Sequence, residues 1–146
     1  MYESKGMQGT LYNDMSELML SASMDWTIKL WYPKNEFSTN PIFTFESSQE
    51  YVYDIQWSPV HPSVFASVDG DGFLDIWDIN RDKESPLAHK QAFENNVSAN
   101  QAYKDYDQSR ALSCLKWSRD GRKIAIGDAD GFVSIWNVDK SLSNPK

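Results

Sequence analysis

The sequence is short of the residues from which disulfides, metal centres and membrane spans are built. Cys114 is the one cysteine among 146 residues, so no internal disulfide can form and a reducing compartment fits. His61 and His89 are the only histidines, which leaves no zinc ligand set. No segment approaches the roughly 18 consecutive apolar residues of a membrane-spanning helix, and the opening MYESKGMQGT has no signal-peptide core. We therefore expect a cytoplasmic location, no metal and no membrane partner.

Basic charge is also scarce, since 14 Lys and Arg stand against 21 Asp and Glu and the net charge is -7. An acidic surface repels phosphate backbones, so we expect no nucleic-acid partner. The sequence contains no phosphate-binding loop, no dinucleotide fingerprint and no nucleophile elbow, and we therefore expect neither catalysis nor a cofactor. Hydrophobic residues make up 40% of the chain, which is enough for a folded domain.

An internal repeat is the strongest positive feature of the sequence. Aligning three tryptophans brings SASMDWTIKLW, SVDGDGFLDIW and IGDADGFVSIW into register, ending at Trp31, Trp77 and Trp136. An aspartate precedes each of these tryptophans by six residues, at Asp25, Asp71 and Asp130. Apolar residues then alternate with polar ones, which is typical of a half-buried strand. Each copy is therefore predicted to end in a turn followed by a strand.

A second tryptophan repeats with the first, because Trp57 precedes Trp77 by 20 residues and Trp117 precedes Trp136 by 19. The intervening sequences read as strand, turn, strand, turn and strand, and weaker fourth strands follow at 41–45 and 86–93. Four antiparallel strands per unit make a propeller blade. We therefore predict an all-β fold, a partial β-propeller over residues 1–146 that does not close a ring. Its blades are expected at about 7–45, 51–93 and 110–139, with a polar insert loop at 94–109.

The two Asp-x-Asp-Gly turns invite a calcium interpretation that the spacing does not support. A helix-flanked calcium loop requires a glutamate at its twelfth position, and counting from Asp69 and Asp128 gives Asn80 and Asp139. These segments are instead predicted to be hairpin turns.

The alternation of apolar and polar residues along the strands also predicts which side chains are buried. Cys114 is expected to be a buried core thiol, and the five repeated tryptophans are expected to lie in the core.

The repeated residues resemble the WD-repeat family, of which Trp77-Asp78 carries the literal dipeptide. The resemblance implies a polar tetrad in which a turn aspartate (Asp25, Asp71 or Asp130) bonds with a histidine, a serine or threonine and a tryptophan. Ser23 matches the serine or threonine position, which Asp69 and Asp128 fill in the other copies. The sequence has no Gly-His pair, so the full tetrad cannot form.

The phrases DWTIKLW, YVYDIQWSPVHPSVFASVDGDGFLDIWDIN and GRKIAIGDADGFVSIWNV resemble more closely the carboxy-terminal propellers of cytoplasmic dynein intermediate chains. The resemblance implies a non-enzymatic scaffold subunit of a microtubule motor. Its propeller would dock on the dynein heavy chain, join other dynein subunits and link cargo to transport along microtubules. A scaffold of axonemal dynein, or of a coat or signalling complex, remains an alternative. A propeller hydrolase would need a carboxylate or metal cluster that these spacings do not supply.

Two further expectations concern surfaces. Trp26 lies in a turn on the rim where the blades are connected, near Tyr51 and Tyr53, and these three aromatic residues are candidate partner contacts. The alternative is that Trp26 folds back over a neighbouring blade.

An arc of blades also leaves apolar faces and strand edges in water, so we expect the chain to self-associate, most simply as a homodimer.

Overall fold

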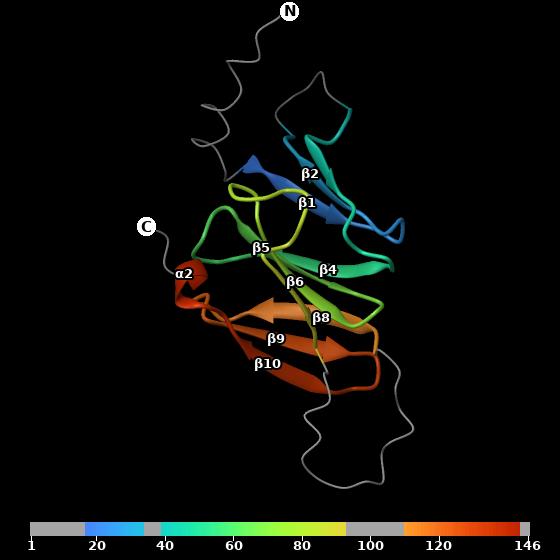
Figure 1. The fold of residues 1–146 in the computed structure, drawn as a ribbon, viewed down its shortest axis with the longest axis vertical. Coiled ribbons are helices and arrows are strands. Elements are labelled where there is room, and N and C mark those ends of the chain that lie inside the picture. The colour runs from blue at the N-terminus through green and yellow to red at the C-terminus, as the bar shows by residue number, and fades with distance from the viewer. Residues whose placement is uncertain (1–16, 34–38, 93–109, 144–146) are drawn as a thin grey trace, which may run out of the picture.

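The computed structural model describes residues 17–33, 39–92 and 110–143, which form three antiparallel sheets stacked one beside the next (Figure 1). The first sheet contains β1 (Met19–Ala22), β2 (Ile28–Trp31) and β3 (Phe43–Phe45). The second sheet contains β4 (Val52–Trp57), β5 (Val64–Asp69), β6 (Phe73–Asp78) and β7 (Ala88–Gln91). The third contains β8 (Leu112–Trp117), β9 (Lys123–Asp128) and β10 (Val133–Asn137), followed by the short helix α2 (Lys140–Ser143).

Each sheet is an up-and-down meander in which neighbouring strands follow one another in the chain. The tryptophan alignment makes β1, β2 and β3 equivalent to β5, β6 and β7, because Trp31 and Trp77 lie 46 residues apart. It likewise makes β8, β9 and β10 equivalent to β4, β5 and β6. The middle sheet therefore shows all four strand positions of a blade. The strand expected near 7–12 and the insert at 94–109 lie outside the described residues.

The turns between the second and third strands of the three blades share one backbone conformation. Gly72 and Gly131 have φ values of 86° and 90°, in the left-handed region that glycine enters without steric cost. Trp26, at the same place in the first blade, has φ of 69°. A second shared irregularity is a shift of register between Val52 and Asp54 on β4, which recurs between Leu112 and Cys114 on β8.

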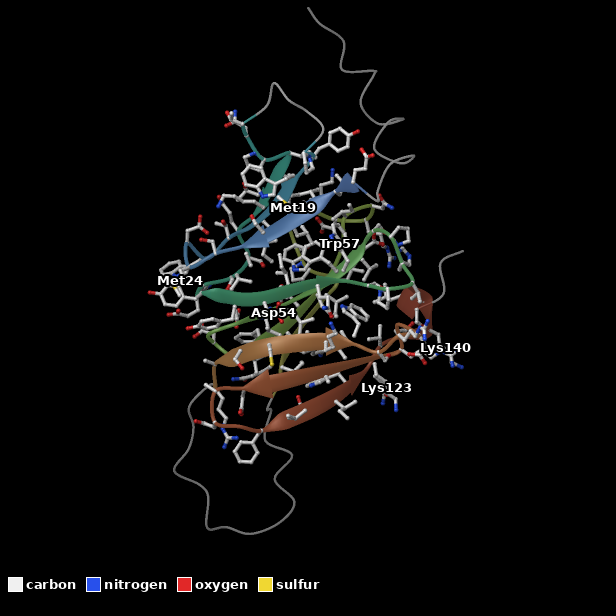
Figure 2. The ribbon with its side chains drawn as sticks, turned by 180° about the vertical axis from the view of Figure 1, so that it is seen from behind. Met19, Met24, Asp54, Trp57, Lys123 and Lys140 are labelled. Carbon is white, nitrogen blue, oxygen red and sulfur yellow. The ribbon has the colours of Figure 1, made fainter. Side chains whose placement is uncertain are left out.

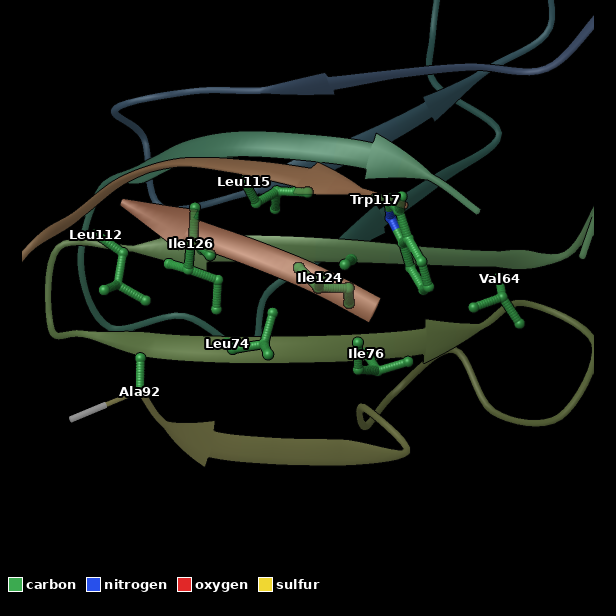
Figure 3. Packing of buried hydrophobic residues seen from close by; sticks show 11 residues of the cluster. Val64, Leu74, Ile76, Ala92, Leu112, Leu115, Trp117, Ile124 and Ile126 are labelled. Atoms are coloured by element: carbon green, nitrogen blue, oxygen red, sulfur yellow. The ribbon is translucent and has the colours of Figure 1, made fainter. Parts of the chain in front are cut away.

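Two hydrophobic clusters join the blades, one at each boundary. Between the first and second blades, the ring of Phe45 meets Phe65 and Trp77 edge-on, with centroids 5.3 and 5.0 Å apart. Figure 3 shows the second boundary, where Leu74 and Ile76 of β6 face Ile124 and Ile126 of β9. Burial of these side chains is the main force that holds one blade against the next.

The inner strands of the second and third blades are tied by polar contacts. The carboxylate of Asp54 accepts a hydrogen bond from the backbone N–H of Leu115 at 2.9 Å, and the Gln56 side chain accepts one from the N–H of Trp117 at 3.0 Å. The indole of Trp117 donates back to the Gln56 carbonyl at 3.1 Å. Side chains of β4 thus accept hydrogen bonds from backbone N–H groups of β8. These bonds hold the second and third blades together along their inner strands.

Candidate interaction surface

The turns of the second and third blades are held by an aspartate at their first position. Asp69 Oδ1 accepts the backbone N–H groups of Asp71 and Phe73, at 3.1 and 2.9 Å. Asp128 Oδ1 does the same for Asp130 and Phe132, at 3.0 and 2.7 Å. Asp69 and Asp128, rather than the repeat aspartates Asp71 and Asp130, thus accept the backbone N–H groups of these turns. The reason is geometric, because a carboxylate at the end of the second strand reaches over the turn to the next amides.

The equivalent turn of the first blade divides this task between two side chains. Ser23 Oγ accepts the N–H of Asp25 at 3.2 Å, and Asp25 Oδ1 accepts the N–H of Thr27 at 3.1 Å. Lys29 lies 2.6 Å from the other carboxylate oxygen, and its hydrogen bond holds the pKa of Asp25 well below the usual range. Ser23 and Asp25 therefore act together in this turn, while Asp25 remains solvent-exposed.

Two of the three repeat tryptophans donate to a serine ten residues earlier. The indole N–H of Trp31 lies 2.8 Å from Ser21 Oγ, and that of Trp77 lies 3.3 Å from Ser67 Oγ. Trp136 donates instead to Ser134 at 3.1 Å. The serine partner of Trp31 is therefore Ser21, where the family pattern pointed to Ser23. The ten-residue spacing was visible in the aligned repeats and could have identified both serines.

The environments of the repeat tryptophans differ. Trp77 and Trp117 are buried, whereas Trp31, Trp57 and Trp136 are half-buried. Trp57 packs against Phe65, with ring centroids 5.5 Å apart.

Asp78, the second residue of the literal dipeptide, is buried at the end of β6 and closes the following turn. Its Oδ1 accepts the hydroxyl of Ser63 at 2.7 Å and the backbone N–H of Asn80 at 3.0 Å. Ser63 also lies 3.1 Å from His61 Nδ1. This cluster lies at the other end of the blade from the Asp69 turn, and its hydrogen bonds stabilise the chain reversal that follows β6.

A buried carboxylate that the sequence did not single out lies between the first two blades. Asp75 Oδ1 is 2.6 Å from His89 Nδ1, and the imidazole stacks on Phe73 with ring centroids 4.1 Å apart. Ser47 Oγ, from the connection between the blades, is 3.5 Å from the second oxygen. Burial raises the pKa of Asp75 to about 6, against the opposing effect of His89. The pair of Asp75 and His89 is therefore a polar contact at the boundary between the two blades.

Cys114 is solvent-exposed, so the expectation of a core thiol was wrong. The register shift after Leu112 turns the side chain of Cys114 to the face of β8 that points away from the second blade. Its sulfur lies beside Gly127, where an added Cβ would approach it to 2.9 Å. The apolar character of the strand was predicted correctly, but the bulge changed which face this residue occupies.

Exposed aromatic side chains gather at the end of the sheets where the Asp69-type turns lie. We call this end the turn face and define it by residues 23–27, 69–73 and 128–132 with Tyr51, Tyr53 and Arg110. It lies at the right in Figure 1 and at the left in Figure 2, where Met24 marks it. Trp26, Tyr51 and Tyr53 are 48%, 40% and 45% exposed.

Three aromatic residues of the turn face, Trp26, Tyr51 and Tyr53, lie at the boundary between the first two blades. The rings of Tyr51 and Tyr53 meet edge-on, with centroids 6.2 Å apart. The Tyr51 carbonyl accepts the N–H of Gly70, which ties this strand to the Asp69 turn. Trp26 borders a small cleft whose walls include Phe45 and Asp69. Trp26 therefore faces the cleft at the boundary with the second blade and still presents about half of its surface to solvent.

The turn face of the third blade has a different character. The Arg110 guanidinium lies over the Phe132 ring at 4.5 Å and pairs with the carboxylates of Asp128 and Asp130 at 3.6 and 3.5 Å. Ala111 and Ser113 occupy the positions of Tyr51 and Tyr53. The exposed tyrosine pair is thus a feature of one blade boundary and is not repeated at the next.

Neither a metal centre nor a membrane helix is found in the described part of the chain. Across residues 17–33, 39–92 and 110–143, no three His, Cys, Asp or Glu side chains gather closely enough to hold a metal ion. Within the same residues, no helix has the length and apolar character needed to span a membrane.

Comparison with known proteins agrees with the repeat geometry. The model of the WD domain, G-beta repeat, matches residues 8–32, 39–78 and 101–137, which is more than half of the chain. The chain belongs to the WD-repeat family. The all-β prediction of a propeller fragment with three blades and no closed ring is confirmed by this match and by the three antiparallel sheets.

A structural relative supports the same fold for this WD-repeat chain. The WD40 domain of coronin from Toxoplasma gondii superposes with a TM-score of 0.65 over 83% of this chain and 28% of that chain. The sequences are 21% identical, so this likeness concerns the fold alone.

The sequence comparison narrows the position of the chain within the family. It is 39% identical over 140 residues to the cytoplasmic dynein 1 intermediate chain of Drosophila melanogaster. The alignment covers 93% of this WD-repeat chain and 19% of the Drosophila protein. The resemblance to cytoplasmic dynein intermediate chains is thereby confirmed over almost the whole chain, which spans about a fifth of that relative's length.

Proposed function

We propose that the chain is a non-catalytic scaffold element of a cytoplasmic dynein motor complex. The observation that carries this proposal is the 39% identity to a dynein intermediate chain over 93% of the chain. In this role the propeller docks on the tail of the dynein heavy chain, associates with other dynein subunits and links cargo to transport along microtubules. Its location is cytoplasmic and microtubule-associated.

The turn face is the proposed docking surface. Trp26 takes up a left-handed backbone conformation that costs an ordinary residue about 1–2 kcal/mol, at a position where the other blades have Gly72 and Gly131. Sparsely populated backbone conformations concentrate at functional sites. Trp and Tyr are also enriched among the residues that contribute most of the binding energy at protein interfaces. Trp26, Tyr51 and Tyr53 are therefore assigned as the partner contact.

Two alternatives place the same fold in a different assembly. A WD-repeat scaffold of axonemal dynein, or of a coat or signalling complex, would use the same sheets, as the fold likeness to coronin illustrates. The long shared sequence favours the cytoplasmic motor. The identity of the bound subunit distinguishes these alternatives.

A binding experiment tests the function and the surface separately. The full chain is immobilised and titrated with purified dynein heavy-chain tail. We expect binding that the variants Trp26→Gly and Tyr53→Ala weaken about tenfold or more. The matched control is Ile42→Ala, because Ile42 is 43% exposed and lies beside Leu30, toward the end of β2 remote from the turn face.

The two failures have different meanings. No binding of the heavy-chain tail by the wild-type chain, at concentrations that saturate an authentic intermediate chain, contradicts the motor assignment. Binding that the Trp26 and Tyr53 variants leave unchanged contradicts the surface assignment alone.

A further inference from the structure

The third blade binds a guanidinium group on its own turn. Arg110 pairs with the carboxylates of Asp128 and Asp130 at 3.6 and 3.5 Å, and its guanidinium lies over the Phe132 ring, 4.5 Å from the centroid. Carboxylates and the face of an aromatic ring are the groups with which a guanidinium interacts best. The Asp128 turn is therefore a guanidinium site that the chain fills with its own arginine.

The turn of the second blade repeats this geometry without the arginine. Asp69 accepts two backbone N–H groups of its turn, as the equivalent aspartate of the third blade does. The Gly70 N–H donates to the Tyr51 carbonyl at 2.9 Å, and the corresponding bond of the third blade measures 3.0 Å. Tyr51 follows Glu50, whereas the corresponding carbonyl belongs to the residue after Arg110. Glu50 therefore occupies the second-blade position of Arg110, and an acid replaces the base.

The exchange leaves two carboxylates of the second turn without a cation. Within residues 17–33, 39–92 and 110–143, no lysine or arginine forms an ion pair with Glu50 or Asp71, and both residues are partly exposed. Asp69 is satisfied differently, because its second oxygen accepts the hydroxyl of Ser48 at 2.9 Å. Lys29 already pairs with the aspartate of the first blade's turn at 2.6 Å. The second turn is therefore an acidic surface that a cation from outside would neutralise.

An exposed aromatic ring lies beside this acidic surface. Phe73 corresponds to the ring at the third turn, but it is already stacked on His89 with centroids 4.1 Å apart. The open ring is that of Tyr53, which is 45% exposed. A Cβ added to Gly70 would lie 3.4 Å from Cε2 of this ring and 3.5 Å from a carboxylate oxygen of Glu50, so the ring and the carboxylate flank the same residue. The second turn thus presents the two kinds of group that hold the guanidinium at the third.

We propose that Glu50 and Asp71 bind an arginine side chain of the docked partner, which stacks on Tyr53 beside Trp26. The proposal rests on the proposed function, because it states the chemistry of the group that the turn face receives. The partner's guanidinium takes the role in the second blade that Arg110 has in the third. Arginine suits the site better than lysine, because a planar guanidinium pairs with carboxylates and stacks on a ring at the same time. The docking segment of the partner is therefore basic.

A peptide titration tests the arginine site without any motor subunit. The isotope-labelled full chain is titrated with the peptide acetyl-Gly-Arg-Gly-Arg-Gly amide, and NMR follows the amide signals of Gly70 and Asp71 and the indole signal of Trp26. Two matched peptides carry lysine or citrulline, a neutral analogue of arginine, in place of both arginines. We expect saturable shifts with the arginine peptide, weaker binding of the lysine peptide, and affinity for the citrulline peptide lower by at least about tenfold. Equal affinities for the arginine and citrulline peptides, or no shift at these three residues, would overturn the proposal.

Glu50→Arg is the most informative variant, because it gives the second blade the arginine that the third blade has. The new guanidinium is expected to pair with Asp71 and to weaken binding of the arginine peptide at least about tenfold, without lowering the urea midpoint of unfolding. Asp71→Asn removes one charge at constant shape and is expected to weaken binding by about threefold or more. Glu84→Arg makes the same change of charge at an exposed residue in the chain reversal after β6, remote from the turn face, and is expected to bind as the wild type does. Unchanged binding by Glu50→Arg, or an equal loss in Glu84→Arg, would contradict the assigned site.

Titration of the same variants with purified dynein heavy-chain tail separates a failure of this proposal from a failure of the proposed function. We expect Glu50→Arg to weaken binding of the tail at least about tenfold and Glu84→Arg to leave it unchanged. Equal binding of the tail by the wild type and Glu50→Arg would overturn the arginine contact and leave the motor assignment intact. A wild-type chain that binds the arginine peptide as expected but does not bind the tail would retain the arginine site and contradict the motor assignment alone.

Discussion

Trp26 and Gly72 occupy the same position of successive blades, and both adopt a left-handed backbone, with φ of 69° and 86°. Glycine enters this region freely, whereas a bulky side chain is strained there. The tryptophan in the first turn is thus maintained at a conformational cost that the other two blades avoid. Its side chain borders the cleft between the first two blades and remains about half exposed, which is consistent with a role at an interface.

Replacing Trp26 with glycine is expected to change the free energy of unfolding by less than about 1 kcal/mol. The loss of apolar surface that the indole covers beside the cleft is offset by relief of the backbone strain. Truncation of a well-buried tryptophan costs about 3–5 kcal/mol by contrast, and Trp77→Ala provides that comparison. Urea denaturation of the two variants measures both quantities. A loss of several kcal/mol in Trp26→Gly would show that Trp26 is principally a packing residue.

Asp69→Ala is expected to destabilise the fold by about 1–3 kcal/mol, because it leaves the turn N–H groups of Asp71 and Phe73 without their acceptor. Burial raises the pKa of Asp69, and the like charge of Asp71 adds to that effect. Asp71→Ala removes only this charge and is expected to stay within about 0.5 kcal/mol of the wild type. Thermal melts of the pair, at equal protein concentration, measure the difference. Equal losses would contradict the assignment of the turn to Asp69.

The repeat made the strands predictable, because period-two alternation and tryptophan spacing report directly on which face of a sheet is buried. The hydrogen-bond partners of individual polar side chains were harder to predict from the sequence. Asp69 and Asp71 have the same chemistry and differ by two positions, so only the path of the turn decides which carboxylate reaches the amides. Ser21 and Ser67 could have been predicted as the tryptophan partners, because each lies ten residues before its tryptophan. The family pattern instead indicated Ser23.

Gly72 and Gly131 form a matched pair for testing how the second and third blades fit together. Both have positive φ, so alanine is strained at either position. At Gly72 an added Cβ would also lie 2.7 Å from the carbonyl oxygen of Arg110, whereas at Gly131 no heavy atom lies within 4 Å. Gly72→Ala is therefore expected to destabilise the fold by at least about 1 kcal/mol more than Gly131→Ala. Denaturant midpoints that coincide would show that the Arg110 backbone moves away at little cost.

The buried carboxylate of Asp75 should make stability depend on pH. Its pKa is raised from 3.8 to about 6 in the folded protein, so the folded state binds a proton more tightly than the unfolded state. This contribution to stability is fully present below the unfolded pKa and is lost as pH rises through about 6. A shift of about two pKa units corresponds to at most about 3 kcal/mol.

Asp75→Asn isolates that contribution, since the amide oxygen can still accept a hydrogen bond from His89. The stability of the variant relative to the wild type is expected to be more favourable at about pH 7 than at about pH 4. Urea unfolding of both proteins at each pH measures the double difference. Exposed carboxylates that titrate in both proteins cancel from it. A difference that does not change with pH would show that Asp75 is not desolvated in the folded chain.

The faces of individual residues were harder to predict than the strands that carry them. A bulge after Leu112 shifts the alternation of β8, which placed Cys114 on the exposed face although Leu112, two residues earlier, is buried. Likewise, the pair of Asp75 and His89 joins adjacent strands whose register depends on the turn between β6 and β7. Such details depend on local departures from ideal strand geometry, which a pattern of residue types does not encode.

The central claim is that this chain serves a cytoplasmic dynein motor, and the subunits that accompany it in its native cell test that claim most directly. The protein containing these residues is tagged, isolated at low ionic strength and analysed by mass spectrometry against an untagged control. The account predicts recovery of a dynein heavy chain together with dynein light chains. Recovery of coat or signalling subunits with no motor subunit would contradict it.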